Sequence, residues 1–430
     1  MATGTAETGS GISIHREFQN ALIPETLSAL MRSTWTWDDR ALRRDLSSLL
    51  VAVAAARGEI PDEAIATVLH ARSLAAGARF TADVLGPHLI ADSGSALRAE
   101  FLAAASDPAS FDRIASQAHH QVRSRATDYL GAISRSTYPD ESNWLMMATS
   151  ETAGLSAAMR GYGKALSEAP LFSNVGLAWQ SLRALGGEGT ALRERIEKGE
   201  LRATFAAAER SGSWDPALVR TKAWPDGDDW RLSGTKLFVP DAAGADVILV
   251  IARSIAGPSL YAVDSEAVGL TIIEMDSIDA TRALFRVDFD DTPTRLLGKE
   301  GHGGALMRET IDLAMVALAG EQVGLIERAV AVLLDHTDVE APTDLTRTVL
   351  DHATAVSLWT QALSADAEVG SAAVAHIGCS TASLRVATLA AEIARESKEA
   401  SAILRRALSA SLLLGGPAVF HERLLDRLGI

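Results

Sequence analysis

Few of the side chains that carry chemistry in enzymes form a recognisable pattern in this sequence. His119 and His120 are adjacent, and neighbouring side chains on a helix point about 100° apart, so the pair makes a poor metal site. His302 lies in the Gly-rich stretch Gly-Lys-Glu-Gly-His-Gly-Gly before a helical pattern, where a helix N-terminus can hold an anion. The sequence has no G-x-x-x-x-G-K-[ST] phosphate loop, no G-x-S-x-G nucleophile motif and no H-E-x-x-H zinc motif. No local motif therefore specifies a reaction.

Composition excludes several classes of protein. The chain has 430 residues, 47% apolar and 22% charged, which is typical of a soluble globular protein. Its net charge of −15 argues against binding the phosphate backbone of nucleic acid. The single cysteine, Cys379, excludes an internal disulfide and fits a reducing cytoplasm. Residues 1–14 carry no signal-peptide regions and predict a disordered tail. The longest apolar runs, such as Leu49 to Ala56, are far below the roughly 20 residues that cross a bilayer.

The hydrophobic period divides the chain into three stretches. From about Arg40 to Gly199, apolar residues recur at three and four positions and predict helices, including one through Val53. From Ala203 the period changes to two, and the short runs that follow predict strands with no helices between them. Such spacing favours an antiparallel sheet or barrel over a βαβ arrangement. Helical periodicity returns at Gly304.

We therefore expect an α+β, mostly helical protein with three domains. These are an N-terminal helical domain (1–200), a small antiparallel β-barrel domain (201–300) and a C-terminal four-helix bundle (301–430). The bundle helices are expected at 305–335, 345–369, 371–397 and 398–414. These helices are apolar on more than one face, which predicts contacts with another subunit, either a second copy or a different protein.

The order of elements, together with several short motifs, resembles the acyl-CoA dehydrogenase superfamily. The segment G-E-L-R-A-T-F-A-A-A-E, from Gly199, resembles the family's first barrel strand with its Thr-Glu-Pro motif. Further similar segments are Gly234-Thr-Lys-Leu-Phe-Val-Pro, Asp279-x-x-Arg282, Leu297-Gly298, Gly320-Glu-Gln-Val-Gly324 and Leu414-Gly415-Gly416. The matches cover roughly Glu151 to Gly416, and the first 130 or so residues match poorly.

The resemblance implies α,β-desaturation of an acyl thioester such as acyl-CoA, in which a carboxylate takes the α proton and FAD takes hydride. Family members place this Glu at one of two positions. The position on the long helix, ten residues before Gly324, is Ala314 in this chain. The other is expected about two dozen residues beyond the Gly-Gly turn, past Ile430. Neither usual position thus offers a Glu.

Three other acids are candidates for the base. Glu321 follows Ala314 by seven residues, so it lies near the same helix face but about 10 Å further along. Asp312 is rotated by about 200° from Ala314, and Glu422 follows the Gly-Gly turn. Glu321 is the candidate we retain. For all three acids the ordinary interpretation is a structural charge on or between helices.

The positions that the resemblance assigns to FAD have altered side chains. The implied contacts are Phe205, Ala207, Ala208, Phe238, Val239 and Pro240. Ala208 replaces a family Thr, Trp214 replaces a Ser, and Pro240 stands at a polar position, whereas Phe238 keeps the aromatic that stacks on the flavin. The implied Arg-x-x-Phe-Gly segment is absent after the long helix, and Leu412 replaces a Gln before the Gly-Gly turn. FAD is thus an expected cofactor with several usual contacts missing.

Three functions remain open. The first is an acyl-CoA dehydrogenase-like flavoprotein. The second is a subunit without a base in a heteromeric dehydrogenase, and the third is the same fold reused as a monooxygenase or binding scaffold. The expected partners are an acyl-CoA or acyl-thioester substrate and another subunit bound through the bundle, with no nucleic acid and no membrane span.

Overall fold

The computed structural model describes residues 19–89, 108–150, 152–336, 342–364 and 367–430, so the tail predicted at 1–14 lies outside it. The chain forms two compact units. The first comprises residues 1–134, 334–382 and 418–430, and the second comprises residues 135–333 and 383–417. The three-domain division expected from sequence follows secondary structure, and it remains a prediction.

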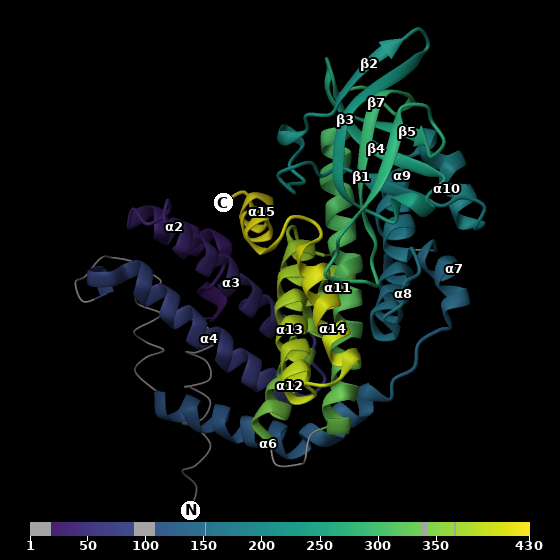
Figure 1. The fold of residues 1–430 in the computed structure, drawn as a ribbon. Coiled ribbons are helices and arrows are strands. Elements are labelled where there is room, and N and C mark those ends of the chain that lie inside the picture. The colour runs from purple at the N-terminus through teal and green to yellow at the C-terminus, as the bar shows by residue number, and fades with distance from the viewer. Residues whose placement is uncertain (1–18, 90–107, 151, 337–341, 365–366) are drawn as a thin grey trace, which may run out of the picture. The chain divides into compact units, whose positions relative to one another are not determined.

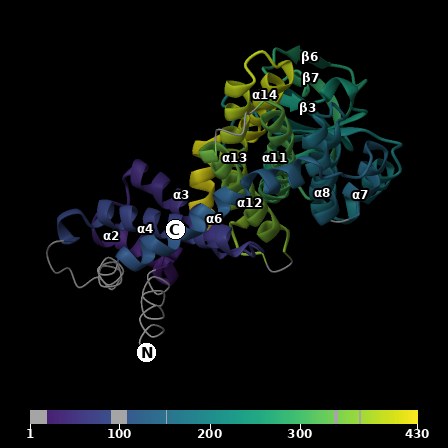
Figure 2. The ribbon, with the colours of Figure 1, turned by 90° about the horizontal axis from the view of Figure 1, so that it is seen from below.

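The first unit is helical. Its helices are α2 (Pro24–Ser33), α3 (Arg40–Arg57), α4 (Glu63–Leu85), η1 (Gly86–Leu89), α6 (Pro108–Ser134), α12 (Pro342–Leu363), the start of α13 (Ser371–Ile393) and α15 (Pro417–Leu428). Asp39 and Asp62 cap α3 and α4 by accepting hydrogen bonds from first-turn N–H groups. Helices α2, α3 and α4 lie together (Figure 2). Their buried residues, including Leu27 and Leu46, pack with Leu425 of α15 into one core.

The second unit contains helices on both sides of the strands in sequence. They are η2 (Glu141–Asn143), α7 (Trp144–Ala148), α8 (Thr152–Ala165), the π-helix η3 (Phe172–Trp179), α9 (Gln180–Leu185), η4 (Gly187–Gly189), α10 (Thr190–Glu197), η5 (Pro216–Leu218), η6 (Ala242–Gly244), α11 (Gly303–His336) and α14 (Lys398–Leu412). Helices α8 and α11 lie side by side (Figure 1). A Cβ on Gly163 would lie 2.2 Å from the Glu321 carbonyl oxygen, and one on Gly324 would lie 2.0 Å from that of Arg160. Glycine at these positions therefore lets the two backbones approach closely.

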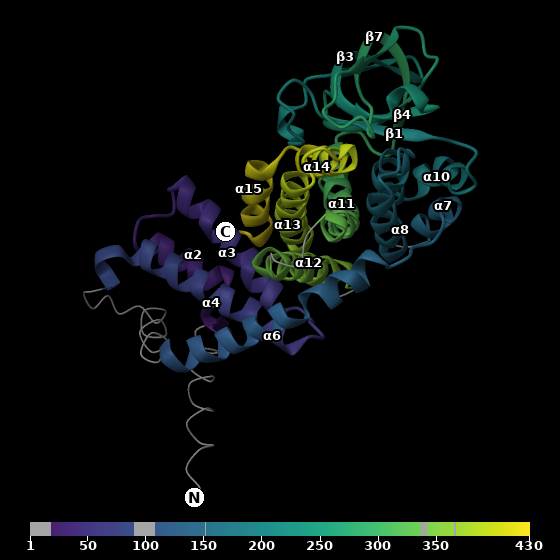
Figure 3. The ribbon, with the colours of Figure 1, turned by 60° about the horizontal axis from the view of Figure 1, so that its bottom comes forward.

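The strands form a closed barrel with two additions (Figure 3). They are β1 (Ala203–Ala206), β2 (Lys222–Asp226), β3 (Asp229–Pro240), β4 (Val247–Ser254), β5 (Gly257–Asp264), β6 (Leu270–Met275) and β7 (Leu284–Leu297). Neighbours pair in the order β4–β2–β3–β7–β5, and β5 pairs with β4 to close the ring. β6 adds to β7, and β1 adds to β4. The interior is filled by buried residues such as Leu232, Val250 and Val287.

The α+β, mostly helical fold is confirmed, with corrections in detail. The sheet is not wholly antiparallel, because β1 runs parallel to β4 and β2 makes one parallel pair with it. The predicted helix 345–369 ends at Leu363, and the predicted helix 371–397 ends at Ile393. Helix α15 is not among the four helices predicted for the bundle. It begins at Pro417, after two glycines of positive φ, and proline is typical of the first turn of a helix. Among the described helices, none alone is long and apolar enough to cross a membrane, whereas the bent pair α14 and α15 passes that test together.

Candidate functional site

Glu321, the candidate base, lies at the centre of a buried ion cluster. Its side chain on α11 is fully buried, and both carboxylate oxygens accept hydrogen bonds from Nη2 of Arg282, at 2.8 and 2.7 Å. One oxygen also accepts a 2.6 Å hydrogen bond from Nε of Arg406 on α14. Arg282 precedes β7, so one carboxylate joins the long helix to the barrel and to a second helix. A carboxylate engaged in this way is paired before any substrate arrives.

Two further groups complete this cluster. Asp279, 1% exposed, places Oδ2 3.8 Å from Nη1 of Arg406, which also donates to the Thr281 carbonyl oxygen at 3.0 Å. The guanidinium of Arg406 lies over the Tyr162 ring at 4.6 Å. Burial raises the pKa of that tyrosine. Two arginines therefore face two carboxylates, and the balance of charge is what makes burial of four ionised groups tolerable.

The guanidinium groups of Arg282 and Arg406 do not use all of their hydrogen-bond donors within this cluster. Nε and Nη1 of Arg282 and Nη2 of Arg406 are buried without a hydrogen-bond partner among the described residues. Both cations still bind Glu321. Without the charge of Glu321, Arg282 would lose its ion pair, and Arg406 would keep the pair with Asp279. The Glu321 carboxylate therefore compensates the charges of two arginines that are buried with it.

The other acids that the sequence offered do not join this cluster. Ala314, at the base position that the resemblance implies, carries no acid and is fully buried. Asp312 is partly buried on the same helix. Glu422 belongs to the first unit, where it accepts a 2.7 Å hydrogen bond from Arg43. Glu321 is thus the candidate whose surroundings the structure defines in most detail.

The positions implied for FAD belong to the barrel interior or its cover. Phe205, Ala207, Ala208 and Val239 are each at most 3% exposed. The Trp214 ring stacks on the Phe205 ring, with centroids 5.9 Å apart and planes 15° apart, and it is itself 5% exposed. The indole therefore covers the face of strand β1 at which a flavin contact is implied.

The backbone at these positions is also engaged. The Ala207 carbonyl oxygen accepts from Lys236 Nζ at 2.9 Å, and the Ala208 carbonyl oxygen accepts from the Leu237 N–H at 2.9 Å. Pro240 has no N–H, and its carbonyl oxygen accepts a 2.6 Å hydrogen bond from Thr204. These groups are consequently used to hold the barrel together.

Two residues from separate resembling motifs meet in the structure. Lys236 is fully buried and donates to Oε1 of Glu209 at 2.8 Å. Burial lowers the pKa of Lys236 to about 8, although Glu209 opposes the shift. Glu209 also accepts hydrogen bonds from the N–H groups of Arg220 and Thr221. These bonds fix both ends of the segment from Glu209 to Arg220. That segment includes Trp214, and the pair therefore positions the indole over Phe205.

Phe238 differs from the other implied contacts because it is only partly buried. It lies where the register between β3 and β7 shifts, and its φ of 58° is unusual for an aromatic residue. A Cβ on Gly212 would lie 3.8 Å from its ring, so the ring also packs on the segment that carries Trp214.

Taken together, the side chains at the positions implied for FAD do not fit a flavin. Ala208, Trp214 and Pro240 offer no hydroxyl group to a cofactor. The Trp214 indole covers the Phe205 ring on β1, where a flavin contact is implied.

Sequence patterns gave no signal for a small cavity of about 210 Å³ between the π-helix and the barrel. Ser173 of the π-helix donates a 2.5 Å hydrogen bond to Oδ2 of Asp241, and both line this cavity. Asn174 accepts from the Ala203 N–H at 2.8 Å and fastens the helix to β1. Burial raises the pKa of Asp241. Its φ of 53° places this aspartate in the left-handed region, which no sequence periodicity predicts.

The histidines singled out in the sequence lie on the surface. His119 and His120 are exposed on α6, and His302 is exposed immediately before α11. Across the described residues, no group of three or more His, Cys, Asp or Glu side chains is arranged to hold a metal ion.

Comparison with known proteins gives a consistent picture. Residues 204–292 match the family model described as acyl-CoA dehydrogenase, middle domain. The chain is 28% identical over 171 residues to cyclohexane-1-carbonyl-CoA dehydrogenase of Geobacter metallireducens, covering 36% of this chain and 45% of that protein. It is 30% identical over 135 residues to the mitochondrial short-chain specific acyl-CoA dehydrogenase of Bos taurus, covering 29% and 33%. The matched stretches thus span less than half of these relatives.

Among solved structures, butyryl-CoA dehydrogenase from Megasphaera elsdenii superposes with a TM-score of 0.60 at 18% identity. The superposition covers 72% of this chain and 97% of that one. At this identity the likeness concerns the fold.

Proposed function

Because the chain belongs to the acyl-CoA dehydrogenase superfamily, we propose that it works in acyl-thioester oxidation as one subunit of a heteromeric dehydrogenase. In this proposal a related partner subunit brings the catalytic carboxylate and the main flavin contacts. This chain contributes the architecture that completes the shared site. Its substrate class is the acyl thioester, taken from the superfamily, and the acyl group remains unspecified.

The observation that carries the proposal is the state of Glu321. A general base has to lie within hydrogen-bond reach of the proton that it removes, with a lone pair free to accept it. Glu321 instead accepts hydrogen bonds from Arg282 and Arg406 inside a cluster that excludes solvent. Taking the carboxylate out of these ion pairs would leave buried arginine charges uncompensated, which is costly in a medium of low polarity. We therefore assign Glu321 a structural role and seek the base on another chain.

The covered strand supports the same proposal. FAD, when bound to a superfamily member, supplies the hydride acceptor. In this chain Trp214 lies over Phe205, and Ala208 and Pro240 offer no polar side-chain atom to the cofactor. We propose that these residues form barrel core and barrel cover, and that FAD is held chiefly by the partner. Contact between subunits is proposed at the C-terminal helices, where Leu412 of α14 is 50% exposed.

A second function, that of a flavoenzyme acting alone, is favoured by one observation. Phe238, at the aromatic position implied for stacking on the flavin, is only partly buried. An aromatic ring held at a strand irregularity is well suited to an interface with a planar ligand. The two functions predict different behaviour of the purified chain.

The visible spectrum separates them. The chain is purified alone and after co-expression with an acyl-CoA dehydrogenase-like chain from the same organism, each with FAD added. We expect a colourless protein when it is alone and a yellow complex, bleached by an acyl-CoA, after co-expression. A yellow protein that is bleached when alone would establish the second function. A protein that is colourless in every combination would overturn both functions and leave the fold reused as a scaffold.

The role of Glu321 is tested in the same complex. We expect Glu321→Gln to leave the turnover per folded complex unchanged, because the partner supplies the base. Glu309→Gln, an exposed acid on the same helix, is the matched control. If turnover falls by several orders of magnitude only in Glu321→Gln, while the fraction of folded complex is preserved, Glu321 is the base and the assignment fails.

A further inference from the structure

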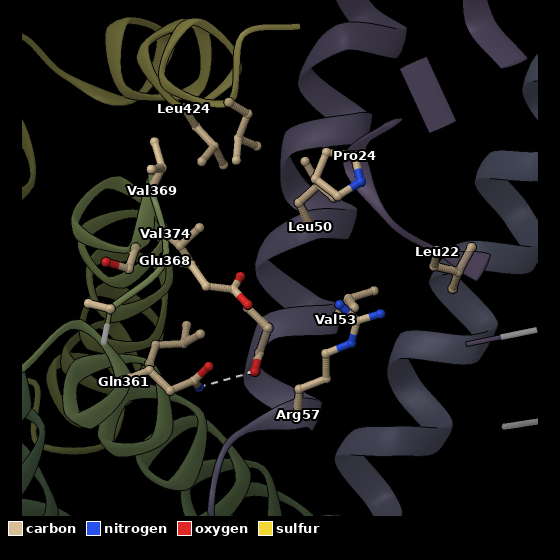
Figure 4. Close-up of a pocket in the computed structure, with 15 residues that line it drawn as sticks. Leu22, Pro24, Leu50, Val53, Arg57, Gln361, Glu368, Val369, Val374 and Leu424 are labelled. Carbon is tan, nitrogen blue, oxygen red and sulfur yellow. Dashed lines mark hydrogen bonds between the residues drawn. The ribbon is translucent and has the colours of Figure 1, made fainter. Parts of the chain in front are cut away.

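The first unit contains a cavity of about 300 Å³ between α3, α12, α15 and residues 367–374, which include the start of α13 (Figure 4). Its walls are mainly apolar, with Leu22, Leu50, Val53, Leu358, Val374 and Leu424 among the lining residues. A volume of this size lies at the lower end of the range for small-molecule sites, which are typically apolar with a few polar groups. None of the lining residues falls in the stretch 204–292 that matches the superfamily model.

Close helix contacts build this cavity. A Cβ on Gly58, just after α3, would lie 2.0 Å from Oγ of Ser357 and 2.5 Å from Nε2 of Gln361, so α3 and α12 meet there without space for a side chain. At the turn before α13, a Cβ on Gly370 would lie 3.0 Å from Leu424 of α15. The Gln361 amide donates to the Ala54 carbonyl oxygen at 3.1 Å and to that of Ser357 at 3.0 Å. The space is therefore bounded by fixed contacts.

Two charged side chains line the cavity. Arg57, the last residue of α3, is exposed and donates one hydrogen bond from Nη2 to the Gln19 carbonyl oxygen, at 3.3 Å. This bond orients the guanidinium and leaves its remaining donors available. Glu368 is also exposed, in the turn before α13. Figure 4 shows both side chains at the cavity, on opposite sides.

We propose that this cavity binds an aliphatic carboxylate of medium length, with the alkyl chain between the apolar helix faces and the carboxylate on Arg57. Alkyl groups gain free energy by leaving water for apolar walls, and a guanidinium matches a carboxylate through paired N–H donors. The ligand is defined by this chemistry alone, whether it is a free fatty acid or the acid released from a thioester. The proposal does not depend on the function proposed above.

The fixed groups favour an anion over a cation. The positive end of α13 begins at Ser371, which lines the cavity, and it adds to the field of Arg57. The Ala54 carbonyl oxygen, near the negative end of α3, is already occupied by Gln361. Glu368 is the opposing charge in the lining, and replacing it should strengthen binding.

Titration calorimetry on the full chain tests this assignment, with decanoate as the probe and decylamine as the probe of opposite charge. We expect saturable binding of one decanoate and no saturable binding of decylamine. Arg57→Gln should weaken decanoate binding by about tenfold or more, the effect of losing a charge-assisted hydrogen bond. Arg40→Gln, the same change at the other end of α3, should leave it unchanged. Glu368→Gln should tighten it by a factor of about two or more.

Three results of these titrations would contradict binding of a carboxylate at Arg57. Absence of saturable decanoate binding, equal binding of decylamine, or equal effects of Arg57→Gln and Arg40→Gln would each overturn the proposal. Both arginines are exposed, so neither substitution should affect folding, and thermal unfolding of each variant checks this. Val374→Phe, which adds an aromatic ring to the wall, should abolish decanoate binding. If it leaves binding unchanged in a protein that is still folded, the alkyl chain does not lie in this cavity.

Discussion

The carboxylate of Glu321 on α11 accepts a 2.6 Å hydrogen bond from Nε of Arg406 on α14, across 85 residues of sequence. Arg282 holds the same carboxylate from the barrel side. The motifs that resemble the superfamily at Asp279-x-x-Arg282 and at Glu321 therefore meet in one cluster of balanced charge. These contacts connect the segment before β7 with α11 and α14.

We expect Glu321→Gln to destabilise the chain by about 3–5 kcal/mol, the usual cost of removing one partner from a buried ion pair. Arg282 would then lose its ion pair with Glu321, and Arg406 would keep only the longer one with Asp279, at 3.8 Å, among the ion pairs of the described residues. Urea unfolding followed by circular dichroism measures the change, with Glu309→Gln as the exposed control on α11. Equal midpoints for the two variants would contradict the structural role.

The close contact of α8 and α11 predicts that Gly324→Ala costs about 1–3 kcal/mol or more, because the added Cβ would lie 2.0 Å from the Arg160 carbonyl oxygen. Backbone atoms cannot move away as a flexible side chain can. Gly187→Ala is the matched control, since nothing lies within 4 Å of its Cβ position. Thermal unfolding of both variants checks the difference, and a fully stable Gly324→Ala would show that the helices are further apart than described.

Trp214→Ala should destabilise the chain by about 3–5 kcal/mol, as expected for removing a large buried aromatic side chain. The indole stacks on Phe205, and its loss leaves a cavity over β1. Trp224→Ala, at a side chain that is 37% exposed, should cost much less. Chemical unfolding compares the two variants, and similar losses would mean that the Trp214 ring is not packed as described.

His376 predicts loss of stability in acid. Its ring is fully buried against Phe420, and burial lowers its pKa from 6.5 to about 3. Between these two values the unfolded chain binds a proton that the folded chain does not. The contribution of the neutral ring is therefore complete above pH 6.5 and declines as the pH falls toward 3, by up to about 1.4 kcal/mol per pH unit.

Urea midpoints at pH 7 and pH 5 measure this effect. His376→Leu should lose less stability than the parent chain over that interval, because leucine has no proton to bind. His302→Leu, at an exposed histidine, should behave like the parent. An unchanged pH dependence in His376→Leu would show that other groups cause the acid sensitivity.

Sequence patterns are most informative for long periodic segments. The long helix predicted at 305–335 corresponds to α11, Gly303–His336, since apolar residues along it repeat without interruption. Helices α12 and α13 end several residues earlier than their periodicity predicts, because a helix terminus depends on local hydrogen bonds, such as the one from the Ser364 N–H to the Gln361 carbonyl oxygen at the end of α12. The parallel pairing of β1 with β4 is not predictable in this way, since alternation within a strand carries no information about its neighbour.

The sequence by itself determined the class of fold, the order of its elements and the resemblance to a superfamily, because these depend on local periodicity and short motifs. It also located the positions where the expected side chains are replaced, such as Ala208 and Ala314. Only the tertiary structure decided which charges pair with Glu321 and what covers Phe205. The pairing of Glu321 with Arg406 and the stacking of Trp214 are long-range contacts, which arise when distant elements pack. Charge compensation and burial are properties of that packing, and no spacing along the chain encodes them.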